Sequence, residues 1–193
     1  MNTKTRTLVG TGILTAIVIV LQTMASGIHI GQFSITLVLI PIVVGAALYG
    51  IKAGAWLGFV FGLITLGDAA LFLGINAVGT VITCILKGTL AGVAAGFVYK
   101  MLENKNRWVA VIAASLVCPI VNSGVFALGC YVFMYKGLQE MVSDGGTVTS
   151  LIFITFIGVN FLIEVGINIV LDPAILRILN IVKKPAPKAE PQA

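Results

Sequence analysis

Long apolar runs separated by short polar breaks fill the chain from Leu8 onward. The hydrocarbon core of a bilayer is about 30 Å thick and needs about 20 apolar residues per helix, so these runs predict membrane-spanning segments. Backbone amides in lipid need internal partners and no alternating barrel pattern is present, so each span is expected to be helical. The expected spans are Leu8–Met24, Phe33–Tyr49, Ala53–Leu66, Ala77–Leu102, Trp108–Tyr135 and Ser150–Leu176.

Two of these runs have ambiguous ends. The first follows Lys4 and Arg6 as a secretory signal would, but it is longer than a signal core and no small-residue cleavage site follows. We therefore expect it to be a retained span. The third is short, and the apolar residues 71–73 could extend it or form a re-entrant piece.

Composition supports the membrane assignment. Of 193 residues, 59% are hydrophobic and 10% charged, and the mean hydropathy is +1.09. Soluble domains carry about 25% charged residues. The predicted fold is an all-α integral membrane protein, a six-transmembrane-helix bundle in one domain over residues 1–182. Residues 183–193, rich in Pro and Lys, are expected to be a disordered cytoplasmic tail.

Basic residues are strongly biased to one side of the predicted bundle. The opposite side holds only Lys136, and Lys87 lies within the fourth span. The rich side holds ten: Lys4, Arg6, Lys52, Lys100, Lys105, Arg107, Arg177, Lys183, Lys184 and Lys188. Since cytoplasmic loops are enriched in Lys and Arg, both termini are predicted to be cytoplasmic, in a prokaryotic plasma membrane. The net charge of +5 therefore reflects topology, and nucleic-acid binding is not expected.

Enzyme and cofactor signatures are missing from the sequence. No GxSxG, HExxH or Walker A motif occurs, and the one histidine, His29, is placed in an outer loop. The three cysteines lie within apolar stretches and form no CxxC pair, so buried thiols are expected. We predict no enzymatic activity, no metal site and no cofactor.

Small residues recur every four positions in three spans. They are Gly50, Gly54, Gly58 and Gly62 in the third, Gly88, Gly92 and Gly96 in the fourth, and Gly12 with Ala16 in the first. Such faces let helix backbones approach closely in lipid. We expect the third and fourth spans to pack within the bundle. The face of the first could pack inside the bundle or against a separate membrane protein.

Two ionisable residues, Lys87 and Glu164, fall near the middle of spans at similar depth. A charge in hydrocarbon is costly, so each must face the interior, a cavity or a partner. One interpretation is an ion pair between them. The other is a solute cavity in the outer half of the bundle, where Lys87 meets an anionic or polar group. The two are compatible if Glu164 orients Lys87.

Several amides could contribute to such a cavity. Asn160, Glu164 and Asn168 share one helical face, and Asn122 lies at mid-depth in the fifth span. The candidate substrate-binding residues are Lys87, Asn76, Asn122, Asn160 and Glu164. A few convergent polar groups among apolar walls are typical of small-molecule sites. His29, with Gln32, is either a solvated loop residue or part of a loop over the cavity mouth.

Three segments resemble the substrate-binding membrane subunits, or S-components, of energy-coupling factor (ECF) vitamin transporters. They are RTLVGTGILTAIVIVL (Arg6–Leu21), with Gly12 and Ala16 where that family has its small-residue motif, TLVLIPIVVGAALYGIKAGAWLGFVFGL (Thr36–Leu63), and GFVYKML (Gly96–Leu102). The Lys52–Gly62 stretch is most similar to the pantothenate-type branch, which tends to have a basic residue where Lys87 stands.

The resemblance implies a specific biological role. The chain would bind a vitamin, with a small carboxylate vitamin such as pantothenate first among the substrates. Through Gly12 and Ala16 it would dock on a transmembrane coupling subunit that joins two cytoplasmic ATPases. Two other function classes remain as alternatives: a stand-alone secondary carrier of a small polar solute, coupled to ions through Glu164, and a lipid-modifying enzyme using Glu164 and Asp68.

Overall fold

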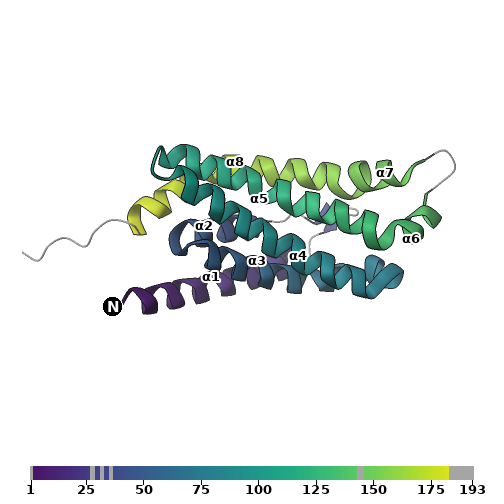
Figure 1. The fold of residues 1–193 in the computed structure, drawn as a ribbon, viewed down its shortest axis with the longest axis horizontal. Coiled ribbons are helices and arrows are strands. Elements are labelled where there is room, and N and C mark those ends of the chain that lie inside the picture. The colour runs from purple at the N-terminus through teal and green to yellow at the C-terminus, as the bar shows by residue number, and fades with distance from the viewer. Residues whose placement is uncertain (1, 27–28, 31–32, 35–36, 143–145, 183–193) are drawn as a thin grey trace, which may run out of the picture.

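The structure is a computed structural model that describes residues 2–26, 29–30, 33–34, 37–142 and 146–182. These residues form an elongated bundle of helices lying roughly along one axis (Figure 1). In chain order the elements are α1 (Thr3–Ala25), β1 (His29–Ile30), β2 (Phe33–Ser34), α2 (Leu39–Tyr49), α3 (Ile51–Thr65), η1 (Leu66–Asp68), α4 (Ala70–Leu102), α5 (Arg107–Gly129), η2 (Cys130–Met134), α6 (Tyr135–Glu140), α7 (Val148–Ser150), η3 (Leu151–Gly158) and α8 (Val159–Val182).

Five helical rods within the described ranges are long and apolar enough to cross a membrane. The last two rods are composite: Arg107–Glu140 joins α5 to α6 through the π-helical η2, and Val148–Val182 joins α7 to α8 through the π-helical η3. Together with the shorter α2 they give the six-helix arrangement that the apolar runs predict. The sixth run extends beyond its predicted end at Leu176.

The second span differs from the prediction. Its helix, α2, begins at Leu39 rather than Phe33 and has 11 residues, which at 1.5 Å per residue is about 16 Å long. Phe33 and Ser34 instead form β2, which pairs antiparallel with β1. In the sequence from Phe33 to Thr36, apolar residues alternate with Ser and Thr, a pattern typical of a strand. A prediction that considers only the number of apolar residues misses this alternation.

The apolar residues 71–73 neither extend the third span nor form a re-entrant piece, the two places that the sequence suggested. They belong to the first turns of α4, which begins at Ala70, directly after the short 3₁₀ turn η1. The helix is kinked at Asn76, whose φ of −153° and ψ of 97° are not helical. The fourth span is therefore a continuous but bent element of 33 residues.

Glycine faces hold α3 against α4, as the four-residue spacing predicts. A Cβ placed on Gly58 would collide with the backbone carbonyl of Gly88, and one on Gly92 would collide with the carbonyl of Gly54. Gly62 packs in the same way against the backbone of Cys84. Because these backbones touch, dispersion contacts along the whole interface replace the side-chain interdigitation of ordinary helix pairs.

The beginning and the end of the described chain lie at the same end of the bundle (Figure 1). The Arg6 guanidinium donates a hydrogen bond to the carbonyl of Val182, the last residue of α8. An even number of crossings requires this arrangement, and the bias of basic residues places that end in the cytoplasm. The predicted tail, residues 183–193, lies outside the described residues.

Candidate functional site

A cavity of about 170 Å³ lies among the helices in the half of the bundle remote from the termini. It is bounded by the end of α3 and by η1, α4, α5, η2, η3 and the start of α8. Its lining is Thr65, Asp68, Ala69, Phe72, Thr80, Thr83, Cys84, Lys87, Asn122, Ser123, Phe126, Met134, Phe156, Ile157 and Asn160. Three of the five predicted substrate-binding residues therefore face one space.

Lys87 reaches this cavity from α4. In the described part of the structure its contacts are with aromatic rings rather than with a carboxylate at ion-pair distance: Nζ lies 5.3 Å from the centre of the Phe126 ring and 5.7 Å from that of Phe61. The rings attract the cation through their π faces but accept no ordinary hydrogen bond. The ammonium donors are thus left for a group that enters the cavity.

Two amides on opposite helices have unsatisfied acceptors. Asn122 on α5 is 6% exposed, and its Oδ1 is buried with no hydrogen-bond partner. Asn160 Oδ1 on α8 is in the same condition. Both side chains line the cavity. Buried polar atoms nearly always have partners in native proteins, so two unpartnered oxygens on side chains that line one cavity indicate that a donor group belongs there.

Glu164 does not line the cavity. It is 1% exposed, and its Oε1 accepts a 2.9 Å hydrogen bond from Asn160 Nδ2. The carboxylate therefore holds the Asn160 side chain through Nδ2, while the Oδ1 atom of Asn160 has no partner. In this geometry Glu164 holds the Asn160 side chain and is not itself part of the cavity lining.

The polar face of α8 continues below Glu164. Asn168 Nδ2 donates a 2.9 Å bond to the carbonyl of Ser115 on α5, and Asp172, one turn further, is also buried. These contacts fix α8 against α5 and so set the rotation of Asn160 toward the cavity. Asp172 extends the predicted stripe by one residue, and the same four-residue spacing from Asn168 would have identified it.

Asn76 has a structural place rather than one in the cavity wall. Its Oδ1 accepts from the Gly79 amide at 2.9 Å, and its Nδ2 donates to the carbonyl of Phe133 at 3.0 Å. The side chain caps the second part of α4 at the kink and ties it to η2. Both groups of the Asn76 amide are thus engaged within the protein, and the residue does not line the cavity.

Sequence reasoning missed much of the cavity rim. The Thr80 and Thr83 hydroxyls donate to carbonyls one turn back, at 2.8 and 2.7 Å, and keep lone pairs for a ligand. Phe72 packs edge-on against Phe126 and Phe156 and forms an apolar wall. Thr83 and Thr80 lie four and seven residues before Lys87 on the same helical face, and this spacing was a usable signal. The contribution of Phe156, in contrast, depends on tertiary packing.

Asp68 links the cavity to α1. The carboxylate lines the cavity, and its Oδ2 accepts hydrogen bonds from Gln22 Nε2 at 2.9 Å and Ser26 Oγ at 2.7 Å. Nothing in the local sequence pattern indicated this connection, because the two partners are more than 40 residues away from Asp68. Within the described ranges, no group of three or more His, Cys, Asp or Glu side chains is placed to hold a metal ion.

The prediction that the three cysteines are buried thiols is confirmed. The environment of the histidine side chain is not described by the structure. Cys84, Cys118 and Cys130 are buried free thiols, and of these Cys84 borders the cavity. The side chain of His29 and the whole of Gln32 are not described. Their suggested place over the cavity mouth stays a prediction.

Comparison with known families decides the identity. A family model described as "ECF transporter, substrate-specific component" matches residues 6–176 of the chain. The chain belongs to the ECF transporter S-component family. No curated protein and no solved structure gives a significant match. The chain is thus a multi-pass membrane protein and the non-enzymatic, substrate-binding subunit of an ECF transporter, working with an ECF module.

The small face of helix α1 in this S-component is turned away from the bundle. Gly12 and Ala16 are both exposed, and a Cβ placed on Gly12 would meet no atom within 4 Å. Gly10, on another side of the helix, packs instead against the Tyr49 ring of α2. This face therefore does not pack inside the bundle, and its contact with a separate membrane protein stays a prediction.

Proposed function

We propose that the cavity captures a small vitamin with a carboxylate group, with pantothenate as the first choice. The observation that carries the proposal is that Lys87 lines one cavity together with Asn122 and Asn160, whose buried amide oxygens have no hydrogen-bond partner. A carboxylate accepts from the ammonium, while hydroxyl or amide donors of the same solute satisfy the asparagines. Pantothenate carries all of these groups.

The aromatic wall supports a solute with an apolar middle. Phe72, Phe126 and Phe156 present ring edges and faces to the cavity, with Phe72 centred 5.3 Å from Phe126 and 5.2 Å from Phe156. Such a wall excludes water from the charged contact. A charge-assisted hydrogen bond to Lys87 is then stronger than it would be in water.

The docking surface in this proposal is the outward face of α1. Gly12 and Ala16 leave the α1 backbone accessible to a helix of the coupling subunit, since small residues permit close approach in lipid. The coupling subunit joins the S-component to two cytoplasmic ATPases. Import is thus powered from outside the chain, and the stand-alone secondary carrier is not favoured by family membership.

Mass spectrometry of small molecules that co-purify with the protein tests the substrate assignment. We expect pantothenate to be released on denaturation, and titration calorimetry to show stronger binding of pantothenate than of pantothenol, its uncharged alcohol analogue. If pantothenol bound as tightly as pantothenate, the proposed recognition of a carboxylate group would be wrong. Release of a different vitamin would replace the substrate and leave the site in place.

A further inference from the structure

A second hollow, of about 840 Å³, lies on the outside of the bundle between α1 and α3. Successive turns of α1 form one wall, with Leu8 and Gly12 exposed on it, and α3 forms the other, with Ala53 and Trp56. We call it the α1–α3 groove. Its walls are mainly apolar and it opens sideways, toward the region that lipid occupies around a spanning bundle.

Two lysines mark one end of the groove. Lys4, in the first turns of α1, and Lys52, at the start of α3, both line it and are both exposed. This is the cytoplasmic end, by the bias of basic residues and the position of the termini. None of the described residues that line the groove is acidic. The cytoplasmic leaflet is where anionic lipids attract basic residues near the membrane surface.

The tryptophan of the groove lies further into the bundle than the two lysines. Trp56 lies one turn along α3 from Lys52, about 6 Å deeper in the membrane. It is 51% exposed, and its Nε1 donates a 3.2 Å hydrogen bond to Thr15 Oγ1 across the groove. The groove thus begins at two cations and continues inward between Gly12 on one wall and the Trp56 indole on the other.

We propose that the α1–α3 groove binds one anionic phospholipid of the cytoplasmic leaflet. The phosphate lies between the ammonium groups of Lys4 and Lys52, and an acyl chain runs along α1 past Gly12, where no side chain obstructs it. The lysine pair favours an anionic headgroup over a zwitterionic one, because the trimethylammonium group of phosphatidylcholine would stand beside two cations. Gly12 is shared with the docking face, so docking of the coupling subunit displaces this chain.

Lipid-selective fluorescence quenching tests the proposal. The sequence has two tryptophans, so Trp108→Phe leaves Trp56 as the sole reporter. This variant is placed in phosphatidylcholine nanodiscs that contain the same small mole fraction of brominated phosphatidylglycerol or of brominated phosphatidylcholine. We expect stronger quenching by the brominated phosphatidylglycerol, since the site concentrates it at Trp56. Equal quenching by the two lipids would overturn the proposal.

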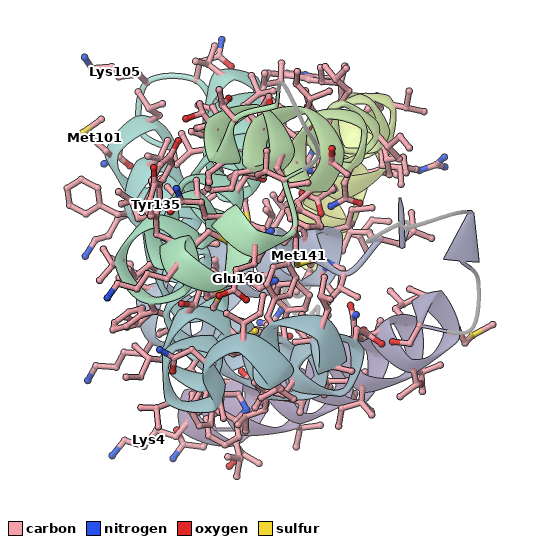
Figure 2. The ribbon with its side chains drawn as sticks, turned by 90° about the vertical axis from the view of Figure 1, so that its right-hand side faces the viewer. Lys4, Met101, Lys105, Tyr135, Glu140 and Met141 are labelled. Atoms are coloured by element: carbon pink, nitrogen blue, oxygen red, sulfur yellow. The ribbon has the colours of Figure 1, made fainter. Side chains whose placement is uncertain are left out.

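Charge variants in the same background supply the controls. Each of Lys4→Gln and Lys52→Gln is expected to weaken phosphatidylglycerol binding about five-fold, and the double variant to abolish the preference. Lys105→Gln removes a cytoplasmic charge at a distant edge of the bundle from Lys4 (Figure 2) and is expected to change nothing. A preference that survives the double variant, or that Lys105→Gln removes equally, would show general surface attraction and refute the site.

Discussion

The side-chain amide of Gln22 donates a 2.9 Å hydrogen bond to the carboxylate of Asp68. Gln22 is 2% exposed and lies on the helix that carries the outward small-residue face, whereas Asp68 borders the solute cavity. One contact therefore joins the helix proposed to dock the coupling subunit with the wall of the binding site. Since its acceptor is charged, the bond contributes more than an average neutral hydrogen bond.

Replacing Gln22 by Met keeps the volume and removes the donor. We expect the free energy of unfolding to fall by about 1.5–3 kcal/mol, because the bond to a carboxylate is lost. Thermal or denaturant unfolding in mild detergent measures it. Gln139→Met, on the exposed side of α6, is the control and should have little effect. Equal stability of the two variants would contradict the importance of the link.

Lys87→Met tests the charge in the cavity. We expect carboxylate-vitamin binding to weaken by about 1.5–3 kcal/mol, roughly 10- to 150-fold, through loss of a charge-assisted bond. Binding of the uncharged alcohol analogue should change much less, so the preference between the two ligands should disappear. Titration calorimetry provides both affinities, with Lys136→Met on α6 as the control. An unchanged preference would favour a purely structural Lys87.

Asn122→Leu is expected to move stability and binding in opposite directions. The buried Oδ1 has no partner in the unliganded protein, so removing it should leave stability unchanged or raise it by about 1 kcal/mol. Vitamin binding should weaken, because the solute donor loses its acceptor. Parallel melting and calorimetry separate the effects. Reduced stability with intact affinity would show a structural amide instead.

Gly12→Trp is expected to leave vitamin affinity intact and to block assembly. No atom lies within 4 Å of the position of a Cβ on Gly12, so the bundle accommodates the indole, but a partner helix cannot approach. Co-purification with the coupling subunit and the two ATPases measures docking, and Ala16→Trp provides a second test. Normal assembly of both variants would place the docking surface elsewhere on the S-component.

Gly58→Ala is the contrasting change on an inward face. The new methyl group would meet the backbone carbonyl of Gly88, which cannot move without separating α3 from α4. We expect a loss of about 1–3 kcal/mol in stability from overpacking, seen as a lower melting temperature. Gly67→Ala, with open space around the added Cβ, is the matched control. Equal melting temperatures would argue against the close α3–α4 contact.

Much of this protein could be predicted from its sequence, because lipid as a solvent acts on each segment locally. A run such as Ala77–Leu102 must form a helix wherever it packs. The distribution of Lys and Arg between the loops indicates which end of the bundle is cytoplasmic. The glycine spacing that places Gly58 against Gly88 is equally local. The main error, the start of α2, arose where the residues around Phe33 satisfy hydropathy but pair as a strand.

Only the tertiary structure decided which polar groups meet. Lys87, Asn122 and Asn160 come from three helices, and their convergence depends on how each helix is rotated against the next. The same holds for Asn76, whose side chain caps the helix at the kink and does not line the cavity, and for the outward orientation of Gly12. Hydrophobicity determines that a helix lies in lipid, but it hardly determines the rotation of the helix about its own axis. That rotation is set by packing between helices that are distant in sequence.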